Sequence, residues 1–307
     1  MPTPKRPDHY YGGQAVLEGV MMRGRDHWAI AVRRPDRSIH LEARDIDSIA
    51  KRHPIFAKPG LRGVIALGQA LAIGVKALTI SANQSAEEDE KLSSGQMAIS
   101  MVIALVFFVG FFVIGPTLLF RFVQHRVHGS LTLNLLEGLF RVALFLGYLF
   151  LIGRMKDISR VFQYHGAEHK TIAAYEHDAP LEPPSVDRFS TLHVRCGTNF
   201  LLIVMILTIF VYAAFGTPTL WWRIASRIVA IPLIAGLAYE VLRLGARYER
   251  SLVMRVLMAP GLWLQKITTK PPSNDQIEVA IASFRELRRK EAEDTRPADE
   301  EQDAVRR

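Results

Sequence analysis

The hexapeptide Tyr164-His165-Gly166-Ala167-Glu168-His169 carries three side chains capable of metal chemistry. Its two histidines are four residues apart, and Glu168 directly precedes the second. On a helix, residues three and four positions apart share one face, so these side chains converge. Two imidazoles bind Zn²⁺-type ions, and the carboxylate can be a third ligand or a general base. The pattern therefore predicts a metal site on a helix.

Three more residues complete the set of candidate ligands. His193 and Cys196 are a second pair of nitrogen and sulfur donors, at a spacing suited to one ion. Glu240 lies within an apolar stretch, where an ionisable residue is a functional candidate or the partner of a nearby arginine. We expect the ligands of Zn²⁺, or of another divalent transition metal, to come from His165, His169, His193, Cys196 and Glu240.

The sequence leaves two kinds of metal site open. If His165, His169, His193 and Cys196 all bind, the shell is closed and the metal is structural. If the two helical histidines bind with only Cys196 or Glu240, one position stays open for water. Glu168 would then be the catalytic base of a hydrolysis. The H-x-x-E-H order also occurs in inverted zinc peptidases.

Apolar residues gather in four long stretches of this 307-residue chain, whose mean hydropathy is +0.13. Each stretch has about 19–24 residues, enough to cross roughly 30 Å of hydrocarbon. We therefore predict an α-helical integral membrane protein with about four transmembrane helices and a small N-terminal β-containing cytoplasmic unit. The stretches are Met97–Phe120, Leu131–Gly153, Thr198–Gly216 and Trp222–Gly245.

Charge distribution predicts how the chain is oriented. The net charge is +8, and basic residues concentrate in the segment between the second and third stretches and after the fourth. An even number of crossings puts both termini on this basic side, which the positive-inside rule assigns to the cytoplasm.

We expect the lipid bilayer as partner. We expect no nucleic acid, because basic residues do not alternate with aromatics on one face, and no protein partner is indicated.

Composition divides the chain into seven segments. We expect a glycine-rich β-containing unit, an amphipathic helix with a polar linker, two transmembrane helices, a cytoplasmic loop with the metal motif, two more transmembrane helices, an interfacial segment with an amphipathic helix, and a disordered tail. Their respective ranges are 1–60, 61–96, 97–153, 154–197, 198–245, 246–290 and 291–307.

Several local patterns predict structure within these segments. Pro35-Asp36-Arg37 is a hairpin turn between two strand-like runs. Three prolines exclude a helix from Asp178–Ser190. The helix of residues 61–83 either lies on the membrane surface or packs against the spans. Ser273 and Gln276 form a capping box at the start of the last helix.

Two further features allow alternative interpretations. The run Gly12–Gly24 contains four glycines, and is either a tight β-turn unit or a pocket lined by Gln14, Glu18 and Arg23. Glu137 lies four residues before Arg141 within the second stretch. Mutual pairing is the simpler interpretation, and a polar route for a substrate is the alternative.

Three runs resemble the YqhQ-like family of bacterial membrane proteins. They are GGQAVLEGVMMRG at Gly12–Gly24, YHGAEHK at Tyr164–Lys170 and RCGTNF at Arg195–Phe200. The resemblance extends from Tyr10 to Phe284, although members often have proline at the position of Val194. Members of this family carry a domain of unknown function. The resemblance implies a metal-dependent enzyme in the bacterial cytoplasmic (inner) membrane. We expect a hydrolase of unspecified substrate; the alternative is a non-catalytic scaffold or assembly factor with a structural metal.

Overall fold

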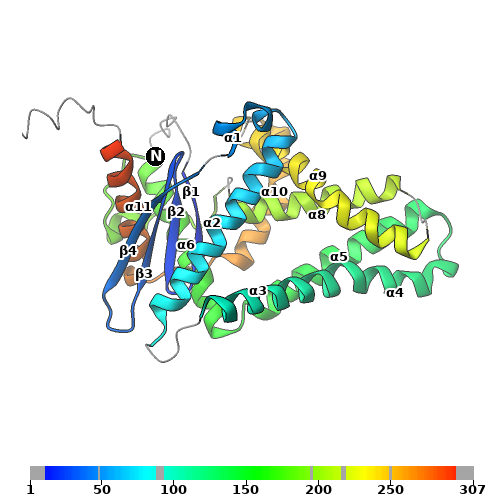
Figure 1. Cartoon of the computed structure of the whole chain (residues 1–307), viewed down its shortest axis with the longest axis horizontal. Helices are drawn as coiled ribbons and strands as arrows, with labels where there is room; N and C mark the ends of the chain where they lie inside the picture. Colours follow the sequence, from blue (N-terminus) through cyan, green and yellow to red (C-terminus); the bar gives the residue numbers. More distant parts are fainter. Residues whose placement is uncertain are drawn as a thin grey trace, which may run out of the picture.

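The computed structural model describes residues 11–47, 49–87, 93–193, 196–215, 219–248 and 251–294. A small sheet with covering helices lies at one end, and long helices extend away from it (Figure 1). The protein is therefore mainly helical, and the predicted N-terminal β-containing unit is confirmed.

The sheet is an antiparallel meander with the strand order β1-β2-β3-β4. The strands are β1 (Gly12–Val16), β2 (Gly19–Arg23), β3 (His27–Arg33) and β4 (Ile39–Asp45). The predicted turn at Pro35-Asp36-Arg37 joins β3 to β4, and the Asp36 carboxylate accepts a hydrogen bond of 2.9 Å from the Ser38 N–H. The run Gly12–Gly24 forms the first hairpin, as expected for a β-turn unit.

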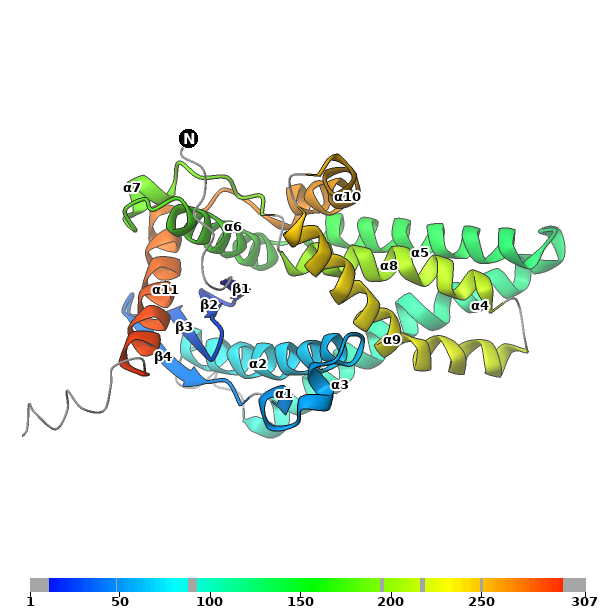
Figure 2. The same cartoon turned by 90° about the horizontal axis from the view of Figure 1, so that it is seen from above.

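Helices cover both faces of this sheet (Figure 2). On one face pack α6 (Lys156–Glu176) and α11 (Asn274–Asp294), and on the other packs α2 (Leu61–Ser85). Because side chains alternate along a strand, neighbouring residues enter different cores. Val20 and Met22 face α6 and α11, whereas Met21 joins Ile73 and Ala77 of α2. Segments far apart in sequence thus build one three-layer unit.

Five described helices are long and apolar enough to cross a membrane. Four correspond to the predicted stretches. The first is a continuous rod of α3 (Ser94–Phe108), the π-helix η3 (Val109–Ile114), α4 (Gly115–Val123) and the short 3₁₀-helix η4 (Gln124–Arg126). The others are α5 (Ser130–Ile152), α8 (Gly197–Ala214) and α9 (Leu220–Arg247).

The fifth apolar helix is α2, which was expected on the membrane surface or against the spans. It packs against α9 on one side and against the sheet on the other, after the short helices α1 (Ile49–Arg52) and η1 (Pro54–Ala57). Its apolar surface is thus partly explained by the sheet that it covers.

Two local expectations need correction. One helical turn, α7 (Pro183–Val186), lies within the segment from which prolines were taken to exclude a helix. Proline is tolerated there because the first N–H groups of a helix have no intrahelical partner. The expected disordered tail begins too early, since α11 continues to Asp294; residues 295–307 lie outside the described residues.

The C-terminal elements are α10 (Leu252–Thr268) and α11. The predicted capping box at the start of α11 is confirmed. The Ser273 hydroxyl accepts from the Gln276 N–H at 3.4 Å, and the Ser273 N–H donates to the Gln276 side chain at 2.9 Å. This cap fixes where the chain turns into the helix that covers the sheet.

Replacing Ser273 with Ala should destabilise the protein by about 0.5–2 kcal/mol, because the first turn of α11 loses its side-chain cap. Ser251→Ala is the matched control, since Ser251 precedes α10 without a side-chain cap. Thermal unfolding in detergent and amide exchange at Gln276 would measure the effect. Equal behaviour of the two variants would contradict the role given to the cap.

Candidate metal centre

Helix α6 presents His165 and His169 side by side, with ring centroids 4.4 Å apart. The Nδ1 atom of His165 lies 2.9 Å from the Thr268 carbonyl oxygen, and that of His169 lies 2.5 Å from the Thr191 carbonyl oxygen. A carbonyl only accepts hydrogen bonds, so Nδ1 carries the proton in both rings. Each Nε2 therefore has a lone pair available for a metal.

Cys196 is brought to these rings as the N-cap of α8. Its Sγ lies 3.2 Å from the His165 Nε2 and also forms a hydrogen bond with His169. Burial alone would raise the pKa of the Cys196 thiol, but the contacts with His169 and Thr198 outweigh it and hold the pKa below its usual value. Burial lowers the pKa of His169, which favours its neutral ring.

The three donor atoms of His165, His169 and Cys196 lie within 4.8 Å of one another. A tetrahedral zinc ion with bonds of about 2.1 Å to nitrogen and 2.3 Å to sulfur would separate such donors by about 3.5 Å. The distance of 3.2 Å between His165 Nε2 and Cys196 Sγ is close to that separation. The set therefore fits Zn²⁺ or another divalent transition metal, and the backbone carbonyls already orient both rings.

Glu168 is buried beside this group, with 4% of its surface exposed. Its Oε2 atom is fully buried without a hydrogen-bond partner, and its side chain accepts a hydrogen bond from the Gly13 N–H. Burial raises the pKa of its carboxyl to about 8; His165 opposes the rise and Cys196 adds to it. The Glu168 carboxyl thus interacts electrostatically with His165 and Cys196. Its oxygens are not part of the compact group of three donor atoms.

The first hairpin contributes to the site through Gly13, which was not among the residues predicted from the sequence. A Cβ at Gly13 would lie 2.9 Å from Glu168 Cδ and 2.5 Å from the Met21 carbonyl oxygen. Only a residue without a side chain lets β1 approach Glu168 so closely. The glycine-rich run was the available signal, but nothing in the sequence indicated which glycine meets the glutamate.

The three polar residues of this run do not form one pocket. Gln14 lies against Gly74 of α2, and Arg23 donates to the Gln69 side chain at 3.0 Å. Glu18 alone among them lines a polar hollow of about 840 Å³, where Tyr164 and Arg160 contact its carboxylate. The β-turn interpretation of the run is therefore the one that the geometry supports.

His193 lies next to the group without joining it. Its ring centroid is 5.6 Å from that of His169, and its Nε2 faces the Glu176 carboxylate at 3.6 Å. Gln265 holds the His193 backbone by two hydrogen bonds, of 2.8 and 2.7 Å. His193 is thus firmly positioned beside the site with a carboxylate as its neighbour.

The structure does not bring Glu240 to the other candidates. Its carboxylate pairs with Arg62 of α2, with 2.7 Å between Arg62 Nε and Oε1, and accepts from the Gly60 N–H at 3.4 Å. A two-pronged guanidinium contact of this kind occupies both carboxylate oxygens. Glu240 therefore joins α9 to α2, and its partner is an arginine far away in sequence rather than the nearby arginine considered above.

A second group of possible ligands lies between β3, β4 and α11. His27 Nε2 is 2.6 Å from Asp294 Oδ2 and 3.3 Å from Asp45 Oδ1. Lys290 already places its ammonium 3.4 Å from Asp45 and 3.6 Å from Asp294. Because a cation of the protein neutralises these carboxylates, this group is an ion-pair network that ties the last helix to the sheet.

Comparison with known proteins places the chain in a family. Residues 58–290 match the model of a family described as "Protein of unknown function (DUF1385)". The chain belongs to this family. It is also 38% identical over 296 residues to the uncharacterized protein YqhQ of Bacillus subtilis (strain 168), covering 92% of this chain and 93% of that protein. No solved structure matches.

The family resemblance expected from the three sequence runs is therefore confirmed. The descriptions of the family and of its Bacillus subtilis relative state no activity. The geometry around His165, His169 and Cys196 is therefore the feature of this chain that points to a function.

Gly13→Ala should destabilise the protein by about 1–3 kcal/mol, because the new methyl group must displace β2 or Glu168. Gly12→Ala is the matched control, since a Cβ there meets nothing within 4 Å. Thermal unfolding midpoints of the two variants in the same detergent would test this contact. A Gly13→Ala midpoint equal to that of Gly12→Ala would show that β1 does not constrain Glu168.

Proposed function

We propose that the protein is a metal-dependent hydrolase acting at a membrane face, with His165, His169 and Cys196 as ligands and Glu168 as general base. The observation that carries this proposal is the three-donor group with an additional buried carboxylate beside it. Catalytic zinc sites have three protein ligands and keep one position for water, whereas structural sites are closed by four.

Each residue would have a defined task in this chemistry. When bound, the metal would lower the pKa of a water molecule and polarise the substrate. The carbonyls of Thr268 and Thr191 hold both imidazole rings with Nε2 toward Cys196. In its ionised form, which the charge of a bound metal would favour, Glu168 would take the proton from the attacking water, and its unpartnered Oε2 supports this role. Burial of Glu168 and His169 limits the access of bulk water.

A second candidate function is a non-catalytic scaffold or assembly factor with a structural metal. The position of His193 favours it, because this ring lies 5.6 Å from that of His169. If His193 turned from Glu176 toward the group, four ligands would close the shell. The two proposals therefore differ in the role of one histidine.

We also propose that four of the five apolar helices cross the membrane. The sheet, α6 and α11 share one hydrophobic core, and α2 packs on the opposite face of the same sheet. These elements must lie on one side of the bilayer. The chain must therefore cross an even number of times between α2 and α6, and again between α6 and α11. Residues 94–152 supply two crossings and residues 197–247 supply two more. For this shared side we propose the cytoplasm of a bacterial cell.

Purified protein should bind one Zn²⁺ or similar ion per chain, as measured by elemental analysis. Cys196→Ala should weaken binding by more than the roughly 10–100-fold that loss of an outer hydrogen-bond partner costs. His193→Ala should weaken metal binding by no more than this roughly 10–100-fold loss relative to the wild type. In cobalt-loaded protein, the sulfur-to-metal absorption band should vanish with Cys196→Ala and persist with His193→Ala.

In the same metal analysis, Glu168→Gln should retain the metal. In a strain whose growth requires the protein, this variant should not support growth. Glu176→Gln is the control for a change in carboxylate charge near the site. A stoichiometric loss of metal from His193→Ala, with Glu168→Gln fully functional, would favour the scaffold. A well-folded wild-type protein that binds no ion would overturn both proposals.

Topology can be tested with single cysteines in a Cys196→Ser background. Asp36→Cys in the β3–β4 turn and Arg188→Cys after α7 should react with an impermeant maleimide from the same side of a sealed vesicle. His128→Cys, between η4 and α5, should react from the opposite side. All three positions are exposed. Labelling of Asp36→Cys and Arg188→Cys from opposite sides would mean that α2 crosses the bilayer.

A further inference from the structure

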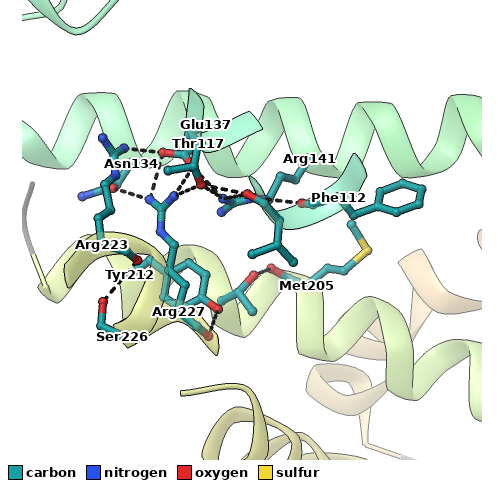
Figure 3. A network of polar contacts seen from close by, with 12 residues as sticks. Phe112, Thr117, Asn134, Glu137, Arg141, Met205, Tyr212, Arg223, Ser226 and Arg227 are labelled. Carbon is teal, nitrogen blue, oxygen red and sulfur yellow. Dashed lines mark hydrogen bonds and ion pairs between the residues drawn. The ribbon is translucent and has the colours of Figure 1, made fainter. Parts of the chain in front are cut away.

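A cluster of charged residues lies among the apolar helices α4, α5 and α9 and shares no residue with the candidate metal centre. Glu137 of α5 is completely buried, and arginines from two helices converge on it (Figure 3). Arg141 donates to Glu137 at 2.6 Å and Arg227 donates at 2.8 Å, while Arg223 also contacts the carboxylate. The expected pairing of Glu137 with Arg141 is thus confirmed, but it involves only one of three cations.

The backbone near Pro116 accommodates part of this cluster. Proline has no N–H, so the Phe112 carbonyl four residues earlier loses its helical partner. Arg141 Nε donates to that carbonyl at 3.2 Å, and Thr117 Oγ1 donates to the Val113 carbonyl at 2.8 Å. The π-helix of residues 109–114 and the proline therefore supply neutral acceptors to an arginine.

Neutral acceptors do not balance the charge of the cluster. One carboxylate faces three guanidinium groups, which leaves an excess of two positive charges among the described residues. The remaining partners are uncharged: Asn134 Oδ1 accepts from Arg227 at 3.2 Å, and the Tyr212 ring lies 5.2 Å from Arg227. Buried charges are costly unless they are compensated, and more so among membrane-spanning helices.

Arg223 is the member with unused binding capacity. Only 4% of its surface is exposed, and its Nε atom is buried without a hydrogen-bond partner. A guanidinium presents its donors in a planar fork that matches two oxygens of a phosphate. Arg223 uses one edge of this fork for Glu137 and has a free donor in another direction.

With α9 as a membrane crossing, as proposed above, Arg223 lies near the level of lipid headgroups. Arg223 is the fourth residue of α9, about 5 Å along the axis from its first residue. The adjacent Trp221 and Trp222 are 82% and 65% exposed, as expected of aromatic anchors at the membrane–water boundary. An anionic group at this level could reach Arg223 without entering the hydrocarbon centre.

We propose that this cluster, which we call the Glu137 arginine cluster (Glu137, Arg141, Arg223 and Arg227), binds a phosphate group through Arg223. The excess of two positive charges matches an anionic ligand, and the free Nε donor provides its contact. The phosphate can belong to an anionic lipid headgroup or be an inorganic phosphate ion. This inference is independent of the metal centre.

The test uses the full chain in nanodiscs of phosphatidylcholine, with either phosphatidylglycerol in the bilayer or inorganic phosphate in the buffer. For the wild type, the bound anion should raise the thermal midpoint by roughly 5 °C. Arg223→Gln should lose this increment yet fold, because Glu137 keeps Arg141 and Arg227. Arg154→Gln, an exposed arginine at the other end of α5, is the matched control and should keep it.

The two additions distinguish the sources of the phosphate. An increment with phosphatidylglycerol alone, and retention of that lipid in native mass spectra of wild type but not of Arg223→Gln, would establish a lipid site. An increment with inorganic phosphate alone would establish a site for the free ion. The proposal is overturned if neither addition stabilises the wild type, or if Arg223→Gln responds as strongly as Arg154→Gln. If Arg223→Gln fails to fold, the absence of an increment in the wild type still overturns the proposal.

Discussion

The contact between α6 and the chain leaving α10 is the constraint on which the rest of the structure depends. Gly166 faces the Lys270 carbonyl so closely that a Cβ there would overlap it. The Lys270 N–H donates to the Phe162 carbonyl at 2.9 Å, and its ammonium donates to the Gly153 carbonyl at 2.7 Å. This contact places the Thr268 carbonyl against His165 and sets the direction of α11 toward the sheet.

The same arrangement couples the apolar helices to the candidate metal centre. Cys196 is both the cap of α8 and one of the three donors, so the start of that helix fixes the sulfur relative to His165 and His169. Asn199, one turn further, is joined through Gln265 of α10 to the backbone of His193. The candidate metal centre and the ends of two helices therefore form one hydrogen-bonded block, and a shift of α8 would change the distances between the three donor atoms.

The sequence predicted the parts of this arrangement that follow from local periodicity. The spacing of His165 and His169 on one helix, the apolar stretches, the hairpin of β3 and β4 and the cap at Ser273 are all encoded in continuous stretches of sequence. It also named Cys196 as a candidate donor, and the structure brings its sulfur close to the two histidines. The pairing of Glu240 with Arg62 could not be predicted, since 178 positions separate them and several arginines were nearer in sequence. For the same reason, no pattern indicated that Gly13 meets Glu168 or that α2 covers the sheet.

The shared core of the sheet and α11 has a consequence for the order in which the protein can fold. The strands are synthesised first, but Phe284 and Leu287, which fill the core against them, arrive after all the apolar helices. Until then, the face of the sheet bearing Val20 and Met22 lacks most of its cover. The nascent sheet therefore stays partly uncovered while the apolar helices assemble. Its core closes only when α11 packs against it.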